Sequence, residues 1–312
     1  MNNIEEDTAN FLNMWQQAEP EISDTRHKQA IVSGMGGSGI SGEILSAFSD
    51  TTNFCQVTSW NDYNLPQWVT KEYLVICISY SGNTAETLSA AKTAIDIGCD
   101  LEVITTGGKL KKLAEENNLN ITEIEKGHQP RAALPLLLKA LIYKINLPNL
   151  EEQISEVNNL KLPVSESKNI ASKLKGTIPC IYSSGLMNPV AYRWRCQIEE
   201  NAKQLAFNHQ IPEMNHNEIV GWTLPSNQMS VILIRDTNEK TQIKNRFKAT
   251  KSVAWDKLEI IECTAKGKTP LARIISMIIL GDLISIELAK LNSVDPTPVE
   301  IIEDLKKELD GK

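Results

Sequence analysis

A turn rich in hydroxyl side chains follows a continuous apolar run in the first third of the sequence. The run is Leu74–Ile78, and the turn contains Ser79, Ser81 and Thr84 around Gly82. Side chains alternate along a strand, so Ser79 and Ser81 point the same way, and the glycine permits a sharp turn. Hydroxyls beside free backbone N–H groups at the start of a helix suit a phosphate group. We therefore expect a phosphate site that requires no cation.

A second turn, Gly34–Gly39, follows the apolar run Ala30–Val32 and precedes a helical pattern. Its letters match the G-x-G-x-x-G pattern of dinucleotide-binding proteins. That pattern also expects an acidic residue at the end of the second strand, whereas here Asp62 falls in the loop beyond Trp60. The sequence therefore favours a second phosphate-binding turn, in which Ser38 adds a fourth hydroxyl, over a nucleotide site.

These turns belong to a series of strand–turn–helix units, which is typical of a parallel sheet flanked by helices. The strand Leu74–Ile78 is apolar throughout, which predicts a central strand covered on both faces. Asn83 and Glu86 resemble a capping box for a helix at 85–97, and Gly98 suits its end. The other expected elements of this half are helices at 4–18, 40–48 and 130–145, and strands at 30–32, 55–58 and 101–105.

The pattern restarts after residues 146–163, a polar stretch with Pro148 and Pro163 that is typical of a linker or bridge. The segment IYSSGLM in the second half weakly echoes CISYSGN in the first, which indicates two similar lobes. We expect an α/β protein with lobes at 1–150 and 151–312. The second lobe is expected to contain strands at 178–182, 231–234 and 258–261, and helices from 189 and at 270–291.

Composition and charge narrow the class of protein. The 312 residues are 41% hydrophobic, with a net charge of −7, and the absence of a basic stripe argues against a nucleic-acid partner. The apolar run Ile274–Leu280 is too short to cross a bilayer, so no membrane partner is expected. Six scattered cysteines without a C-x-x-C pattern predict free thiols. Because residues 1–20 also lack a signal-peptide pattern, we expect a cytoplasmic protein.

Five segments resemble sugar isomerases of the SIS fold, specifically the phosphoglucose/phosphomannose isomerase branch. The first two are shared by phosphosugar SIS domains and indicate phosphosugar binding, whereas the third carries the chemistry in this branch. The resemblance runs from about residue 30 to the C-terminus. The segments are GMGGSGISGEIL (34–45), SYSGNTAETL (79–88), ENAKQLAFNHQIPEMNHNEIVGW (200–222), PRAALPLLL (130–138) and DPTPVEIIEDLK (295–306).

The resemblance implies two SIS-type lobes, each a flavodoxin-like parallel sheet flanked by helices. It implies an isomerase that interconverts glucose 6-phosphate or mannose 6-phosphate with fructose 6-phosphate by ring opening and proton transfer through a cis-enediol. It also implies a homodimer with shared active sites. The phosphate of the hexose 6-phosphate would be held by the backbone of Gly37 and the hydroxyls of Ser38, Ser79, Ser81 and Thr84.

The same resemblance assigns the catalytic roles. Glu200 would be the base that moves the proton between C1 and C2, and Arg131 would lie near the reacting carbons. His216, contributed by the neighbouring subunit, would assist ring opening. In the C-terminal tail, Thr297 and Lys306 would close over the substrate, with the adjacent Lys307 as an alternative to Lys306.

The residue types suit this reaction. Glu200 lies in a helical pattern with Trp194, Ile198 and Ala202, so partial burial is expected to raise its pKa toward the working pH of a base. A cation such as Arg131 stabilises an enediolate oxygen, and histidine exchanges protons near neutral pH. No cofactor is needed for this chemistry.

Metal binding is a separate question, because other phosphomannose isomerases form an unrelated zinc-dependent class. The four histidines (His27, His128, His209 and His216) contain no i, i+4 pair, and the cysteines lack zinc spacing. We expect an isomerase without a metal ion. Of the remaining histidines, His128 and His209 are expected to be non-catalytic, with His209 a near neighbour of the site.

Three alternatives remain open. A sugar-phosphate-sensing regulator with SIS domains would usually carry a helix-turn-helix, and the residues before the first strand are few and acidic. Another phosphosugar ketoisomerase would share the first two motifs but lack the tail with Thr297 and Lys306. A dinucleotide-dependent oxidoreductase is disfavoured by the missing acidic residue. Pro135 lies within the helix expected at 130–145 and should kink or restart it.

Overall fold

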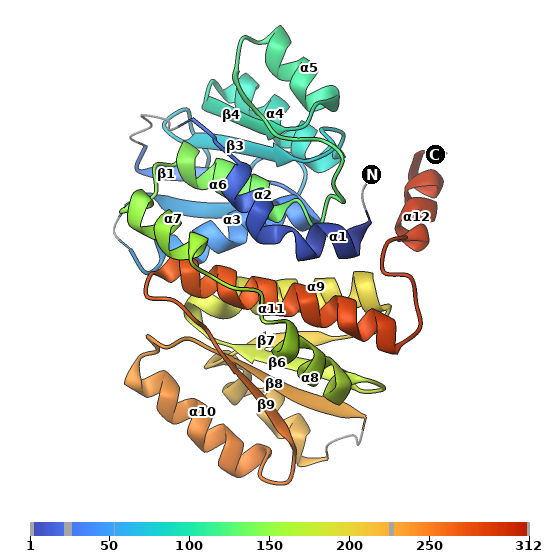
Figure 1. Ribbon diagram of the computed structural model, residues 1–312. Coiled ribbons are helices and arrows are strands. Elements are labelled where there is room, and N and C mark those ends of the chain that lie inside the picture. Colours follow the sequence, from blue (N-terminus) through green and yellow to red (C-terminus); the bar gives the residue numbers. More distant parts are fainter. Residues whose placement is uncertain (1–2, 22–26, 53, 225–227, 311–312) are drawn as a thin grey trace.

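The computed structural model describes residues 3–21, 27–52, 54–224 and 228–310. Within these residues the chain forms two parallel sheets with helices on their faces (Figure 1). The sheets lie at opposite ends of the molecule, and a layer of helices separates them. The expected α/β class with two similar lobes is confirmed.

The first sheet has the strand order β2-β1-β3-β4-β5, and all its pairs are parallel. This is the flavodoxin-like order that the resemblance implied. All six residues of β3 are buried, and β3 occupies the centre of the sheet as its apolar sequence predicted. The strands are β1 (Gln29–Ser33), β2 (Gln56–Trp60), β3 (Leu74–Ser79), β4 (Asp100–Thr105) and β5 (Asn120–Glu123).

Helices cover both faces of the first sheet because alternate side chains of its strands point to opposite sides. Val75 and Cys77 belong to one apolar cluster with residues of α4 and α5. Ile76 and Ile78 belong to another with residues of α3 and α6. The helices of this half are α1 (Ile4–Ala9), α2 (Phe11–Gln17), α3 (Gly36–Ser49), α4 (Ala85–Ile97), α5 (Gly108–Glu116) and α6 (Leu134–Lys144).

The second sheet repeats the same order with one strand fewer, β7-β6-β8-β9, again all parallel. Its strands are β6 (Ile178–Ser183), β7 (Phe207–Gln210), β8 (Met229–Arg235) and β9 (Ile260–Thr264). The helices of this half are α7 (Leu150–Asn158), α8 (Val164–Leu174), α9 (Asn188–Ala202), α10 (Thr241–Ala254), α11 (Pro270–Leu291) and α12 (Glu300–Asp310), with short 3-10 turns η1 (Gly185–Met187), η2 (Glu213–His216) and η3 (Glu218–Thr223).

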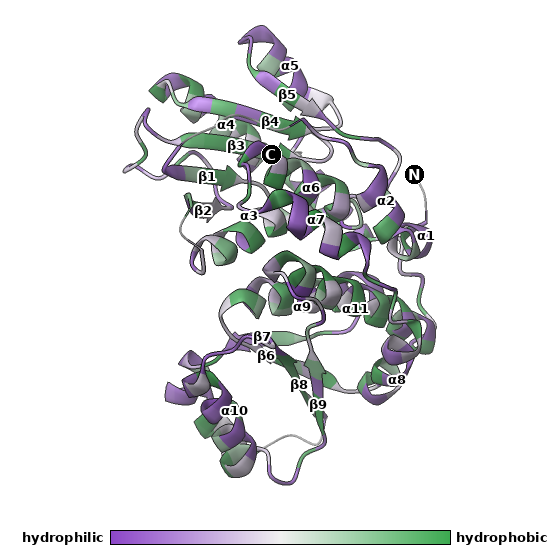
Figure 2. Cartoon of the chain, turned by 60° about the vertical axis from the view of Figure 1, so that its left-hand side comes forward, coloured by the Kyte–Doolittle hydropathy of each residue, from purple (hydrophilic) through white to green (hydrophobic). Residues whose placement is uncertain are grey.

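One apolar core runs through the layer between the sheets, because α3, α9 and α11 contribute to the same cluster. Figure 2 shows α9 and α11 between the two sheets, with mixed hydrophilic and hydrophobic residues on α9 and mostly hydrophobic residues on α11. The buried pair Arg193–Asp282, with an Nη2–Oδ2 distance of 2.7 Å, joins these two helices. Over the described residues, no helix combines the length and apolarity that crossing a membrane requires.

Several boundaries differ from the sequence-based expectation. The first helix is two short helices, and α3 begins at Gly36, within the glycine turn. Helix α6 begins at Leu134, because Pro135 suits the first turn, where no intrahelical N–H bond is needed. Asn83 does not cap α4: Thr84 occupies the cap position, and the side-chain oxygen of Asn83 accepts the backbone N–H of Lys109. The lobe boundary at 150 stays a prediction.

Candidate active site

Two of the three hydroxyls of the turn after β3, those of Ser79 and Thr84, are in contact, and Ser81 lies on the same turn. The Oγ of Ser79 is 2.9 Å from the Oγ1 of Thr84 and accepts the backbone N–H of Gly82 at 3.1 Å. The Oγ of Ser81 accepts the N–H of Asn83 at 3.2 Å. Gly82 has φ 67°, and a Cβ there would lie 1.7 Å from the carbonyl oxygen of Gly107. Only glycine fits, so the turn geometry depends on this residue.

The glycine turn after β1 joins this cluster. β1 and β3 are neighbours in the sheet, with Ser33 opposite Cys77, so both turns leave the same sheet edge. The Oγ of Ser38 accepts the backbone N–H of Tyr80 at 3.3 Å. In the flavodoxin-like order, ligands bind at this point, where the connections from neighbouring strands diverge. The two turns and the N-termini of α3 and α4 therefore lie at the same edge of the sheet.

Gly37 connects the phosphate turns to Arg131. A Cβ on Gly37 would lie 2.8 Å from the carbonyl oxygen of Pro130 and 2.9 Å from the Cα of Arg131. The two backbone segments are thus in close contact, and a larger residue at 37 would push them apart. Arg131 is held directly beside the predicted phosphate site.

Arg131 in turn lies beside Glu200, near the C-terminal end of α9. The Nε of Arg131 is 3.9 Å from the Oε2 of Glu200, and their side chains are 7% and 31% exposed. Burial raises the pKa of the Glu200 carboxyl, and the guanidinium of Arg131 partly opposes that rise. Burial lowers the pKa of Arg131, with Glu200 opposing, yet arginine remains charged at any physiological pH. A base with a raised pKa beside a fixed cation can abstract a proton and stabilise the resulting oxyanion.

The orientation of Arg131 is fixed by three partners, of which only Thr297 was expected from the sequence. Its Nε donates to the Oδ1 of Asn201 at 2.8 Å. Its Nη2 donates to the carbonyl oxygens of Pro296 and Thr297 at 2.6 and 3.0 Å. Asn201 is fully buried, and its position next to Glu200 in the chain was the available signal. Thr297 contacts Arg131 through its carbonyl oxygen, and its predicted closing over the substrate stays a prediction.

Lys203 is a second cation that was missed. Its Nζ donates to the carbonyl oxygens of Glu200, at 2.5 Å, and Pro296, at 3.3 Å. Its backbone has φ 54°, an uncommon conformation for a residue other than glycine or asparagine. Burial lowers the pKa of the Lys203 ammonium, and the nearby charge of Arg131 acts in the same direction. Lys203 lies in the same family-like ENAK segment as Glu200, and this position was the signal that could have identified it.

Two predicted residues are not brought to this site within one chain. His216 ends η2 and is exposed, and its side chain makes no hydrogen bond or ion pair with another described residue. Lys306 lies on α12, whose side chains at 300–309 are all exposed. Figure 1 shows α12 standing apart from the rest of the chain. Among the described contacts, neither side chain touches Arg131 or Glu200, so the roles predicted for His216 and Lys306 stay predictions.

The segment that carries His216 is nevertheless well anchored. Glu218 bridges two partners: its Oε1 accepts the hydroxyl of Tyr182, and its Oε2 lies 2.7 Å from the Nδ1 of His209. The hydroxyl of Tyr182 also accepts the Nε1–H of Trp222 at 2.9 Å. His209 therefore has a structural partner and supports the segment that contains His216.

The turn after β8 in the second sheet lacks the serine hydroxyls of the turn after β3. By strand order, β8 corresponds to β3, and the residues after it include Asp236 and Glu239 rather than serines. The Nε of Arg273 is 2.6 Å from the Oδ1 of Asp236, and Arg235 pairs with Glu239. Carboxylates would repel a phosphate, so the turn after β8 does not repeat the predicted phosphate turn after β3.

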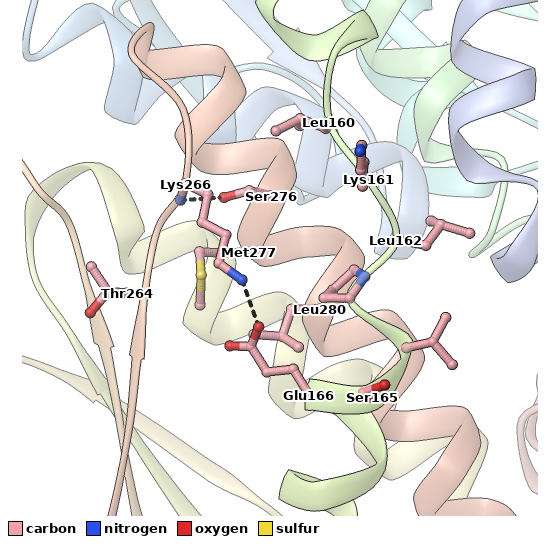
Figure 3. A pocket seen from close by; sticks show the side chains of 12 residues that line it. Leu160, Lys161, Leu162, Ser165, Glu166, Thr264, Lys266, Ser276, Met277 and Leu280 are labelled. Atoms are coloured by element: carbon pink, nitrogen blue, oxygen red, sulfur yellow. Dashed lines mark hydrogen bonds and ion pairs between the residues drawn. The ribbon is translucent and has the colours of Figure 1, made fainter.

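A separate cavity lies in the second lobe, away from Arg131 and Glu200. It has a volume of about 430 Å³ and lies between the start of α8, the end of β9 and α11. Figure 3 shows the ion pair between Lys266 and Glu166 beside Met277 and Leu280. No predicted site residue lines it. Among the described residues, no group of three or more His, Cys, Asp or Glu side chains is arranged to hold a metal ion.

Comparison with known proteins identifies the family. Residues 164–309 match the model of the bacterial phospho-glucose isomerase C-terminal SIS domain. The chain is 37% identical to the bifunctional phosphoglucose/phosphomannose isomerase of Aquifex aeolicus, over 96% of both chains. It is 38% identical to that of Caldicellulosiruptor bescii, over 90% of this chain and 89% of the relative.

A solved structure supports the fold independently. A hypothetical protein from Thermus thermophilus superimposes with a TM-score of 0.73 at 16% identity, covering 99% of this chain and 89% of that one. At such low identity the likeness concerns the fold alone. The family follows from the near full-length identity to the relatives: this chain belongs to the bifunctional phosphoglucose/phosphomannose isomerases.

Proposed function

We propose that the protein interconverts glucose 6-phosphate or mannose 6-phosphate with fructose 6-phosphate. The observation that carries the proposal is the position of the Arg131–Glu200 pair, 3.9 Å apart, where the Arg131 backbone packs against Gly37 of the two hydroxyl-bearing turns. The cluster supplies an anion site, and the pair supplies a base and a cation. An aldose–ketose isomerase needs these three functions.

The phosphate binds at the turns after β1 and β3. The hydroxyls of Ser38, Ser79, Ser81 and Thr84 and the backbone N–H of Gly37 donate to its oxygens. The partial positive charges at the N-termini of α3 and α4 add to this attraction. Binding through hydroxyls and N–H groups also suits a protein of net charge −7, whose overall field repels anions.

Glu200 then moves the proton between C2 and C1 of the open-chain sugar. Its raised pKa makes it a stronger base than an exposed carboxylate. The guanidinium of Arg131 faces the oxygen on which negative charge develops, and its contacts with Asn201 and Pro296 hold it there before the reaction. Such fixed charges need no reorganisation as the enediolate forms.

Ring opening requires a further acid–base group, and we assign it to His216 of a second subunit. His216 is exposed in the single chain and lies on the segment anchored by Glu218. The same region exposes apolar side chains, with Phe207 52%, Leu205 65% and Val220 70% accessible. Exposed apolar groups of this kind mark interaction surfaces. A homodimer would cover them and deliver His216 to the partner's site.

The tail completes the site in this proposal. Thr297 already lies beside Arg131, and the following helix α12 carries Lys306 toward the substrate when the tail closes. Lys307 pairs with Asp304 at 2.8 Å, which favours Lys306 as the residue that acts. The six free cysteines fit the proposed cytoplasmic location.

A coupled assay with fructose 6-phosphate tests the function. We expect both glucose 6-phosphate and mannose 6-phosphate as products, with the rate unchanged by EDTA, because the proposed chemistry uses only side chains. Formation of neither product would contradict the proposal. A rate abolished by EDTA and restored by a divalent metal would contradict its metal independence. Sequence-specific DNA binding without turnover would instead support a sugar-phosphate-sensing regulator.

A further inference from the structure

Helix α1, at the N-terminal end of the chain, packs against the segment that carries Arg131. Ile4 is fully buried and forms a small apolar cluster with Ala132 and Ile286. Ala132 is the residue next to Arg131, and Ile286 lies on α11. The helix is thus seated at the junction of the arginine segment and the central helix layer.

Asp7 makes the polar contacts of this junction. Its side chain is 1% exposed. Its Oδ1 lies 2.7 Å from the Nδ1 of His128, and its Oδ2 accepts the backbone N–H of Gln129 at 2.7 Å. The carbonyl oxygen of Gln129 then accepts the N–H groups of Ala132 and Ala133, at 2.9 and 3.1 Å. Asp7 therefore fixes Gln129, the first residue of the turn that contains Arg131.

The opposite side of this segment is held by the phosphate turns. The hydroxyl of Tyr80 accepts the backbone N–H of His128 at 2.9 Å and donates to the carbonyl oxygen of Glu125 at 3.1 Å. Gly37 packs against Pro130 and Arg131. The segment is consequently enclosed between α1 and the phosphate site, and a displacement at Asp7 would be transmitted to Arg131.

Helix α1 also reaches the tail that holds the guanidinium. The Oδ1 of Asn3, at the start of α1, accepts the hydroxyl of Thr297 at 3.4 Å. The carbonyl oxygen of Thr297 accepts the Nη2–H of Arg131. The helix therefore contacts both the backbone beneath Arg131 and one acceptor of its side chain.

We propose that Asp7 is a positioning residue for the isomerisation, acting through Arg131; this inference rests on the function proposed above. A buried carboxylate is costly to maintain unless it is fully hydrogen-bonded. Asp7 directs its bonds to the two residues that lead into the Arg131 turn. Its effect should therefore appear in turnover, since the phosphate contacts lie on the far side of the segment.

The first test compares Asp7→Ala and Asp7→Asn with Glu6→Gln, a neighbour on the same helix that makes none of these contacts. A displacement of a catalytic group by about 1 Å can cost up to roughly 100-fold in rate. We expect Asp7→Ala to lower kcat about 10-fold with KM within about 2-fold of wild type. Asp7→Asn keeps an acceptor for the Gln129 amide and should recover part of the loss. Glu6→Gln should match wild type.

The second test is a double-mutant cycle with Arg131→Lys, which removes the guanidinium fork but should retain measurable turnover. If Asp7 acts through Arg131, adding Asp7→Ala to Arg131→Lys should cost much less than it does in wild type. Equal losses in both backgrounds, or a raised KM with unchanged kcat, would overturn the inference. Should Asp7→Ala fail to fold, Asp7→Asn enters the cycle in its place.

Hydrogen exchange provides a readout that does not depend on activity. Asp7→Asn should speed exchange at the amides of 129–133 and leave those of the second sheet unchanged; unchanged exchange at 129–133 would contradict the inference. The results distinguish a failure of the proposed isomerase function from a failure of the proposed role of Asp7. A wild-type protein without turnover contradicts the proposed function, whereas an active wild type with fully active Asp7 variants contradicts only the role of Asp7.

Discussion

The guanidinium of Arg131 lies 3.9 Å from the carboxylate of Glu200 without a hydrogen bond between them, while its N–H groups donate to Asn201 and to the carbonyls of Pro296 and Thr297. The carboxylate consequently keeps its oxygens available for a proton, and the cation remains close enough to stabilise a negative oxygen. A direct bidentate pair would have weakened Glu200 as a base, because such bonds favour the ionised carboxylate.

Glu200→Gln should abolish most turnover and leave substrate binding nearly intact. The amide keeps the size of the side chain but cannot accept the C2 proton, and a general base contributes roughly 10²–10⁴ in rate. Steady-state kinetics should show kcat reduced by that factor with little change in the affinity for fructose 6-phosphate. Glu199→Gln, on the adjacent residue, is the matched control and should retain activity. Normal turnover by the Glu200 variant would refute the assignment of the base.

The pH dependence should report the raised pKa of Glu200. Because the base must be ionised, kcat/KM should rise with pH through this pKa, at a pH above the usual glutamate range. Arg131→Gln removes the cation that opposes the shift, so the acid limb should move to still higher pH. Arg195→Gln, which alters a residue that pairs with Glu199, should leave the limb in place. An acid limb that moved to lower pH in the Arg131 variant would contradict the electrostatic coupling.

The same shift has a consequence for stability. A carboxyl with a raised folded-state pKa favours the protonated form in the fold, so its ionisation destabilises the protein as pH rises above the unfolded-state value. Glu200→Gln should therefore raise the Tm at neutral pH, and the difference should disappear at about pH 4, where the carboxyl is largely protonated. Thermal unfolding at both pH values measures this. A variant less stable than wild type at neutral pH would argue against the raised pKa.

Ser81→Ala should chiefly weaken substrate affinity. The hydroxyl would donate to a charged phosphate oxygen, and such bonds contribute about 1.5–3 kcal/mol, which corresponds to a rise in KM of roughly 10- to 100-fold. The backbone of the turn should persist, because Gly82 and Ser79 hold it. Ser172→Ala, an exposed hydroxyl on α8, is the control. An unchanged KM for the Ser81 variant would place the phosphate elsewhere.

Mixing two inactive variants should test the shared active site. In a heterodimer of Glu200→Gln with His216→Ala, one site carries both altered residues and the other carries neither. Random reassociation should restore about a quarter of the wild-type activity, because half the dimers are heterodimers with one intact site each. A mixture that stayed inactive after exchange of subunits, verified by mass, would place Glu200 and His216 of one chain in the same site.

The local sequence determined the elements and the phosphate turns. Strand β3 could be placed because six consecutive buried residues leave a continuous apolar run. The turn after it could be interpreted because Gly82 and its hydroxyl neighbours act through contacts within a few residues. The choice of Glu200, His216 and Arg131 required the family resemblance, because a single glutamate, histidine or arginine has no local pattern that separates a catalytic residue from a solvated one.

The tertiary structure alone decided how Arg131 is held. Its partners come from α9 and the tail, 70 and 166 residues away in the chain, and Asp7 accepts the backbone N–H of Gln129, at the start of its turn, from 122 residues away. Contacts over such separations leave no periodic signal, because they depend on how two sheets and a central helix layer pack together. The capping role expected for Asn83 was wrong for the same reason: a backbone N–H in the first turn of α5, at Lys109, competes for its side chain.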